Sequence, residues 1–357
     1  MSRRAPLLRP LPLGVTLLLL LPVLIVTSVR VGETGLHDLP TALQGCLAAV
    51  RLRAPLPGHV QTIIELRLWR ALTAAGVGAS LALSGALIQG LFRNGLASPS
   101  VLGVTGGASL GATLAILLLG GGYAPLLLGA ESSGSVLVPV CGFVGAALTV
   151  TLVTLLASGG GRLSVPALLL TGIALNTCIA GVLALISALT LRDWEVSRAI
   201  LAWSFGTLDD RSPAHAATVW IGLALAAAVV PFVAWELDLF QAGEDDARSL
   251  GVSTVRVRVL CVISASLAAA SAVAVAGQIA FVGLVVPHVV RLLAGRGHRA
   301  LLPLSVLLGA SFLLAMDLGQ RLLLGRAALP PGVLMSLIGG PFFLLLLFLH
   351  RREIDSW

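Results

Sequence analysis

Lysine is missing from this chain of 357 residues, and all 23 of its basic residues are arginine. A standard ATP-binding P-loop needs the lysine of its G-x-x-x-x-G-K-[ST] motif to reach the phosphates. The chain therefore cannot hold such a site, and an ATP-driven activity would need a separate ATPase subunit to bind ATP and magnesium. Charged residues make up only 11% of the chain, and no run of five like charges occurs, which argues against a nucleic-acid partner.

Cysteine is scarce as well. The four cysteines (Cys46, Cys141, Cys178 and Cys261) are scattered without any C-x-x-C spacing, so we expect neither a metal site nor a disulfide framework. The zinc-enzyme motif H-E-x-x-H is absent, and the six histidines lie mostly at the edges of apolar segments. These absences argue against an integral membrane enzyme, and we expect no metal or cofactor in the chain itself.

Apolar residues are abundant, at 57% of the chain. Segments of about 20 apolar residues recur along its whole length, and each is long enough to cross a hydrocarbon core of about 30 Å. The sequence predicts an all-α polytopic membrane protein with one domain (1–357) and about ten transmembrane helices. The expected spans cover residues 11–29, the region around 76–90, the region around 103–111, and residues 136–157, 164–189, 214–235, 257–276, 279–294, 301–323 and 329–347.

Ten spans place both termini on the same side of the membrane. With the termini in the cytoplasm, 13 of the 23 arginines fall on the cytoplasmic side, most of them in short turns, as the positive-inside rule requires. Two spans carry small residues at a spacing of four, which lets helix backbones approach closely in lipid. The second span has Gly78, Ala82, Ala86 and Gly90, and the third has Gly103, Gly107 and Gly111.

The stretch 277–291, GQIAFVGLVVPHVVR, combines helix-breaking residues with polar ones. Gly277 separates two apolar segments, and Gly283 and Pro287 are expected to interrupt the second. Breaks at membrane depth are tolerated only where protein or a lined cavity satisfies the freed backbone groups. The stretch is therefore expected to face protein or water, although an ordinary kinked helix is a simpler alternative.

Residues 243–251, GEDDARSLG, predict a helix of two turns outside the membrane. Its acidic residues lie at the positive N-terminal end, and Gly251 is placed to cap the C-terminal end. Isolated helices shorter than about 12–15 residues are marginal in water. A partner surface is therefore expected to complete this helix, with an ordinary capped loop helix as the alternative.

A few polar residues fall inside predicted spans. Asn176 should face protein or water, either in a bond between helices or against a substrate. Asp317 and Arg321 stand four apart and can form an ion pair on one helical face. Asp317 is the one carboxylate inside a predicted span, so an ion-coupled secondary transporter is a second functional hypothesis.

Several blocks resemble the membrane permeases of ABC importers for ferric siderophores, haem and vitamin B12. Residues 277–291 are similar to the signature G-x-I-x-F-V-G-L-x-x-P-H-x-x-R, with glutamine at position 278 where most members have proline. Residues 66–112 resemble a second block, with Gly95 where proline is usual, and residues 237–252 resemble the cytoplasmic coupling loop L-x-L-x-x-x-G-E-x-x-A-R-S-L-G-V. The matching signature residues are Gly277, Phe281, Gly283, Pro287, His288 and Arg291.

The resemblance implies the helical bundle of a vitamin B12 importer permease in a bacterial cytoplasmic (inner) membrane. It further implies import of a ferric siderophore, or of haem or cobalamin, delivered by an extracytoplasmic binding protein. A second permease copy and two ATPase subunits would complete the complex. By motif position, the ATPase contacts lie in the loop 237–256, at Gly243, Glu244, Ala247, Arg248, Leu250 and Gly251. The binding protein would dock on Arg67, Arg70 and Arg321, and the cytoplasmic end of the path would lie near Ser164, Val165 and Pro166.

Overall fold

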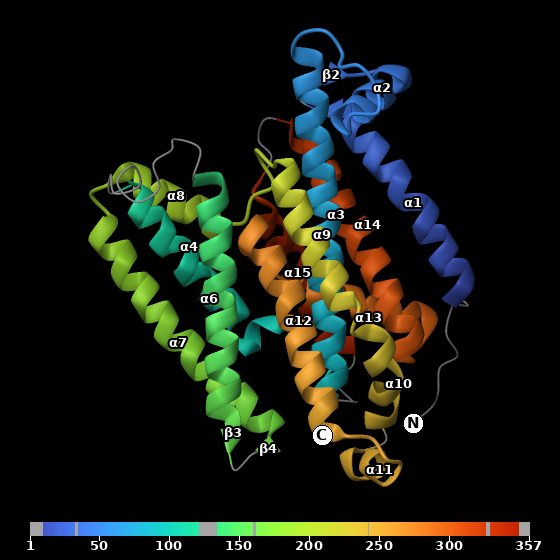
Figure 1. Cartoon of the computed structure of the whole chain (residues 1–357), viewed down its shortest axis with the longest axis vertical. Coiled ribbons are helices and arrows are strands. Elements are labelled where there is room, and N and C mark those ends of the chain that lie inside the picture. The colour runs from blue at the N-terminus through green and yellow to red at the C-terminus, as the bar shows by residue number, and fades with distance from the viewer. Residues whose placement is uncertain are drawn as a thin grey trace.

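The computed structural model describes residues 10–32, 35–120, 134–159, 162–241, 243–325 and 329–349. These residues are mostly helical, with two short antiparallel strand pairs, β1 (Val31–Gly32) with β2 (Gly35–Leu36) and β3 (Ser158–Gly159) with β4 (Arg162–Leu163). Figure 1 shows a long bundle with the short helix α2 (Leu39–Ala49) at one end and α11 (Glu244–Ser249) at the other. We name these the α2 end and the α11 end. Both chain termini lie outside the described residues, so their cytoplasmic placement stays a prediction.

Each expected span coincides with a described apolar helix or a bent pair of helices, but not all of these helices are long enough to cross a membrane. Six are long and apolar enough to cross a membrane alone: α1 (Pro10–Arg30), α3 (His59–Leu91), α6 (Gly134–Ala157), α7 (Val165–Thr190), α12 (Thr254–Ala276) and α14 (His298–Leu324). Together, α9 (Pro213–Ala227) and α10 (Val230–Phe240) are apolar and long enough for a seventh span, and they are bent by 55° at their junction. Three shorter apolar helices complete the set: α4 (Val104–Gly120), α13 (Val282–Ala294) and α15 (Pro331–Leu349). The chain is a polytopic all-α membrane protein.

Helix α3 forms the centre of the bundle (Figure 1), and 94% of its most apolar 18-residue window is buried. Small residues make this burial possible. A Cβ built on Gly78 would overlap the carbonyl oxygen of Gly309 in α14, and one built on Gly85 would overlap that of Gly283 in α13. The close approach predicted from the small-residue spacing of this span is confirmed.

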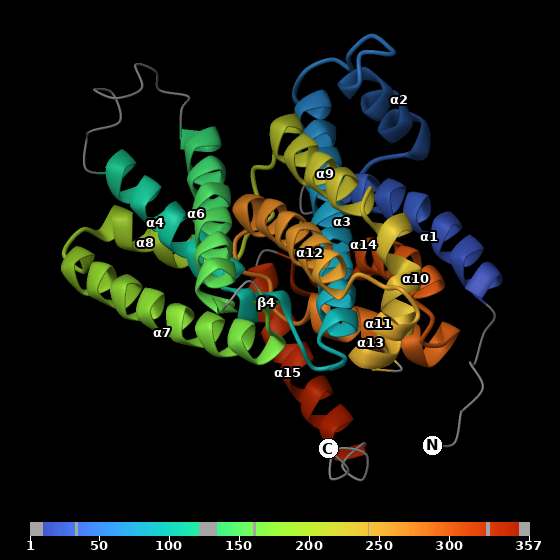
Figure 2. The same cartoon turned by 60° about the horizontal axis from the view of Figure 1, so that its bottom comes forward.

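A second group of helices stands on the left in Figures 1 and 2 and consists of α4, α6, α7 and α8 (Trp194–Ser204). Gly107 packs on Gly145, and Gly111 on Cys141, which brings α4 against α6 as the glycine spacing predicts. Gly103, which was expected in the same helix, instead precedes it with a left-handed backbone (φ 83°). Helix α12 lies between this group and α3 and contacts both. Helix α8 lies between two expected spans, outside the helices predicted from the sequence. It begins where the Asp193 carboxylate accepts a hydrogen bond from the Val196 backbone (3.2 Å).

The predicted break in the stretch 277–291 is present, but two details were wrong. The non-helical segment spans 277–281, and both Gly277 (φ 70°) and Phe281 (φ 65°) adopt left-handed backbone conformations. Helix α13 then runs without interruption through Gly283 and Pro287. Its 13 residues extend about 20 Å, less than a hydrocarbon core of about 30 Å, so the expected eighth span crosses only part of the membrane.

Candidate functional site

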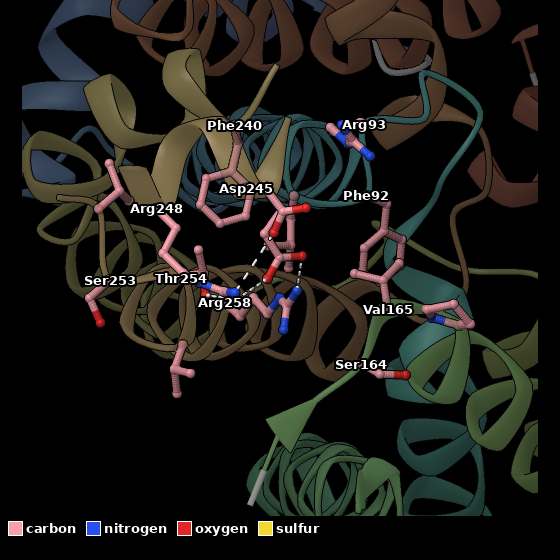
Figure 3. A pocket seen from close by; sticks show the side chains of 15 residues that line it. Phe92, Arg93, Ser164, Val165, Phe240, Asp245, Arg248, Ser253, Thr254 and Arg258 are labelled. Carbon is pink, nitrogen blue, oxygen red and sulfur yellow. Dashed lines mark hydrogen bonds and ion pairs between the residues drawn. The ribbon is translucent and has the colours of Figure 1, made fainter. Parts of the chain in front are cut away.

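A groove of about 950 Å³ opens at the α11 end of the molecule (Figure 3). Three segments that are distant in sequence line it: the end of α3 with the turn that follows, the start of α7, and the region from α10 to α12. The groove brings together two sets of residues that the sequence analysis predicted separately. Arg248 of α11 lies on one side, and Ser164 and Val165 lie opposite; Glu244 and Pro166 line the groove as well.

Helix α11 is six residues long and ends as predicted at Gly251. The Val252 amide donates to the Ala247 carbonyl (3.1 Å) and the Gly251 amide to the Arg248 carbonyl (3.0 Å). This pair of bonds is the Schellman motif, and it requires a left-handed residue at position 251, where φ is 85°. Glycine adopts that conformation without strain, so the local sequence determines where the helix stops.

The chain itself anchors this short helix. Ala247 is fully buried, and the Glu244 carboxylate forms an ion pair with Arg258 of α12. Arg248 also reaches Glu244, at 3.2 Å. Much of the support that was expected from a partner therefore comes from α12. Other side chains of this segment are turned outward: Leu250 is 65% exposed and the Asp245 side chain is 99% exposed.

The opposite side of the groove is the N-terminus of α7. The Ser164 hydroxyl caps that helix by accepting a hydrogen bond from the Ala167 amide (3.1 Å), and Pro166 lies in its first turn. The turn after α3 lacks the usual proline at position 95. There the Asn94 side chain accepts a bond from the Leu96 amide (2.8 Å), which stabilises the turn in another way.

Asn176, in the middle of α7, does not line this groove. Its amide nitrogen donates to the Ser100 carbonyl (2.8 Å) in the short helix η1 (Pro99–Leu102). The side chain therefore forms the bond between helices that was one of its two predicted roles, and a contact with substrate stays a prediction.

The signature residues form a polar contact between α13 and α3. Pro287 has no N–H, so it leaves the carbonyl of Gly283, four residues earlier, without its helical partner. The side chain of Gln89 in α3 donates a hydrogen bond to that carbonyl (3.1 Å), and Arg291 donates to the oxygen of the same Gln89 amide. This bond explains why the helix continues through Pro287. Gln89 lies within the family block at residues 66–112, but nothing in the sequence predicts this contact.

Other signature residues fix the break before α13. A Cβ on Gly277 would overlap the Trp203 carbonyl at the end of α8. Gln278, which replaces the usual proline, donates to the Ser109 hydroxyl in α4 (2.6 Å). His288 is half-buried within α13. The break is thus held by α4 and α8 from the second group of helices.

The three arginines predicted to dock a binding protein lie toward the α2 end, and each bonds within the chain. Arg70 pairs with Asp317 (2.7 Å) and with Asp209, and Arg321 pairs with Asp317 (3.1 Å), as the i, i+4 spacing predicts. Sequence reasoning missed Asp209, because 139 residues separate it from Arg70. With two arginines bound to it, Asp317 is not a free carboxylate for an ion-coupled transporter.

Arg67 is held differently. Its guanidinium donates to the carbonyls of Val29, Arg30 and Gly35, each at 3.1 Å, and thereby fastens the end of α1 to α3. Gly32 makes room for it, since a Cβ there would come within 2.7 Å of the guanidinium.

These features define a polytopic membrane permease with a groove at one end and a broken helix at its centre. The FecCD transport family matches residues 17–349, and the chain belongs to this family. The cobalamin import system permease protein BtuC of Halobacterium salinarum is 38% identical over 310 residues, which cover 86% of this chain and 79% of the relative. The iron-uptake system permease protein FeuC of Bacillus subtilis is 32% identical over 299 residues, 84% of this chain and 87% of the relative.

A solved structure shares the fold. It is an inward-facing conformation of a transporter described as of the metal-chelate ABC type, with 30% sequence identity and a TM-score of 0.78, and it covers 94% of this chain and 99% of that one. The predicted resemblance and fold class are confirmed: the chain is a member of a family of ABC importer permeases. The relatives carry different substrates in their names at similar identity, so membership alone does not specify the substrate.

Proposed function

We propose that this chain is the transmembrane subunit of an ATP-driven importer that moves a ferric siderophore across a bacterial cytoplasmic membrane. An ATPase would bind at the α11 end, two copies per complex, and supply the ATP and magnesium that the chain has no P-loop to hold. A binding protein would deliver the substrate at the α2 end. Among the substrates named for the relatives, iron carried by a chelator is our choice over haem and cobalamin.

The groove at the α11 end carries this proposal. Helix α11 offers Leu250 and Asp245 outward while Glu244 ties it to Arg258 of α12. A movement of α11 would therefore displace α12, the helix that ends at the non-helical segment 277–281. The start of α7 lies across the same groove, so the groove changes shape when α11 and α7 move apart. This geometry suits a subunit whose path is opened and closed by a separate motor.

A second permease copy is supported by α7. Only 11% of the most apolar window of this 26-residue helix is buried. Its large uncovered apolar face suits a homodimer, or a dimer with a similar chain, in which α7 lies beside the path.

The test is ATP hydrolysis by the reconstituted complex of permease, ATPase and binding protein. Gly251→Val places a β-branched residue at φ 85° and should abolish hydrolysis stimulated by the loaded binding protein. Gly297→Val is the matched control, because Gly297 has φ −66° and open space around its Cβ. Binding protein loaded with ferric siderophore, haem or cobalamin distinguishes the substrates. Uptake driven by an ion gradient without the ATPase would refute the proposal.

Breaking the Glu244–Arg258 ion pair between α11 and α12 should uncouple substrate uptake from ATP hydrolysis. Glu244→Gln replaces a charge-assisted bond worth about 1.5 kcal/mol, so we expect about tenfold less uptake per ATP hydrolysed. Asp245→Asn, next to it but 99% exposed, should leave this ratio unchanged. Equal ratios in both variants would show that the Glu244–Arg258 pair does not transmit the movement.

A further inference from the structure

Arg70 binds two carboxylates that differ greatly in exposure. Its Nε and one terminal nitrogen donate to Asp317, at 3.1 and 2.7 Å, and the Asp317 side chain is fully buried. Its other terminal nitrogen pairs with Asp209, whose side chain is 70% exposed. One edge of the planar guanidinium is therefore bound inside the protein, and its other terminal nitrogen points toward the surface.

Without Asp209, the ion-pair cluster of Arg70, Arg321 and Asp317 carries a net positive charge. Arg70 and Arg321 share the single carboxylate of Asp317, which leaves one positive charge. Asp209 neutralises that charge from the surface. Removing a partner from a buried ion is strongly unfavourable, whereas an exposed ion pair is worth little. Asp317 is thus a permanent partner of Arg70, while Asp209 can be exchanged for another carboxylate at small cost in free energy.

Asp209 belongs to a loop, residues 206–212, that rests on the break before α13. The Thr207 amide donates to the carbonyl of Ala276, the last residue of α12 (2.8 Å). A Cβ on Gly206 would come within 2.7 Å of the Gln278 carbonyl, and Leu208 is fully buried. These contacts place the loop against the broken segment at the centre of the permease, and the ion pair between Asp209 and Arg70 adds a further tie, from the loop to α3.

Asp209 differs from the neighbouring charged side chains of the loop in pairing with Arg70. Asp210 is exposed and forms no ion pair within 4 Å among the described residues. Arg211 lines a small cavity of about 330 Å³ under the loop. Burial lowers the pKa of its guanidinium, which Asp209 and Asp210 partly counteract, yet its Nε bonds to neither. Among the described residues of this loop, Asp209 is the one that forms an ion pair with α3.

We propose that Asp209 is an internal stand-in for a carboxylate of the docking protein, occupying Arg70 until an acidic side chain of that protein replaces it. The exchange releases the 206–212 loop from the break between α12 and α13. This inference rests on the proposed function, in which a binding protein docks at the α2 end. It adds a residue of this chain, Asp209, that competes with the docking protein for Arg70, and a reason why docking affects the centre of the permease.

The test measures how fast a buried position in the loop becomes accessible, with Leu208→Cys as the reporter in a background whose four native cysteines are replaced. The full chain is placed in proteoliposomes and labelled with a small water-soluble maleimide. Asp209→Asn should raise the labelling rate about fivefold, the factor that an exposed ion pair at the upper end of its range is worth. Asp210→Asn should leave the rate unchanged, and Asp209→Glu should restore the slow rate.

A carboxylate probe tests the exchange itself. Sodium acetate should raise the labelling rate of the otherwise unaltered protein more than sodium chloride of equal ionic strength, and should have no further effect in Asp209→Asn. Equal labelling rates with and without Asp209→Asn, or equal effects of acetate and chloride, would overturn the proposal. Neither measurement uses an ATPase or a binding protein, so failure here leaves the proposed import function standing, and failure of the ATP hydrolysis test does not alter these results.

Discussion

Helices α3 and α7 are both long, apolar and rich in small residues, yet their surroundings are opposite. The most apolar window of α3 is 94% buried, and that of α7 is 11% buried. Glycines on α3 meet the backbones of α13 and α14. On α7, Gly172 meets the Val101 carbonyl, but Gly181 has no atom within 4 Å of its Cβ position. Hydropathy identifies both as membrane helices but cannot distinguish them, because lipid and protein neighbours are equally apolar. The difference shows which helix organises the fold and which one is left for a partner or lipid.

The largest predicted effect tests this contrast with the same substitution on each helix. Gly85→Leu places a side chain where the Gly283 carbonyl lies, so α3 and α13 cannot approach and we expect no folded protein. Gly181→Leu on α7 should leave the thermal unfolding temperature in detergent unchanged. Size-exclusion elution and thermal unfolding of both variants give the comparison. A stable Gly85→Leu protein would contradict the packing of α3.

The sequence predicts those features of the fold and site that arise from short-range spacing. Three such features are present: the Gly251 cap, the Asp317–Arg321 pair and the break at Gly277. Each depends on residues within about two helical turns of one another. The uninterrupted α13 could not be predicted, since the bond that sustains it comes from Gln89, 194 residues before Gly283. The groove likewise depends on tertiary contacts, although both sets of residues that line it carried a signal in the family motifs.

An intermediate effect is expected from the polar contact that α3 makes with α13. Gln89→Leu leaves the Gly283 carbonyl and Arg291 without this partner, and each unsatisfied buried group costs about 1–3 kcal/mol. The thermal unfolding temperature should fall clearly, with less loss in Gln89→Glu, which keeps an acceptor for Arg291 but no donor for Gly283. If Gln89→Glu is instead the less stable of the two, the bond from Arg291 to residue 89 does not stabilise this contact.

The smallest effect should come from the corresponding polar residue on α7. Asn176→Leu removes one hydrogen bond, to the Ser100 carbonyl, at a half-buried position, so we expect a loss of about 1 kcal/mol. The thermal unfolding temperature should fall less than in Gln89→Leu, and ATP-driven uptake in the reconstituted complex should persist. A fall as large as that of Gln89→Leu would mean that α7 is held by the chain more firmly than its exposure indicates. Loss of uptake without loss of stability would instead assign Asn176 to the substrate path, the second role that its place within an apolar helix allows.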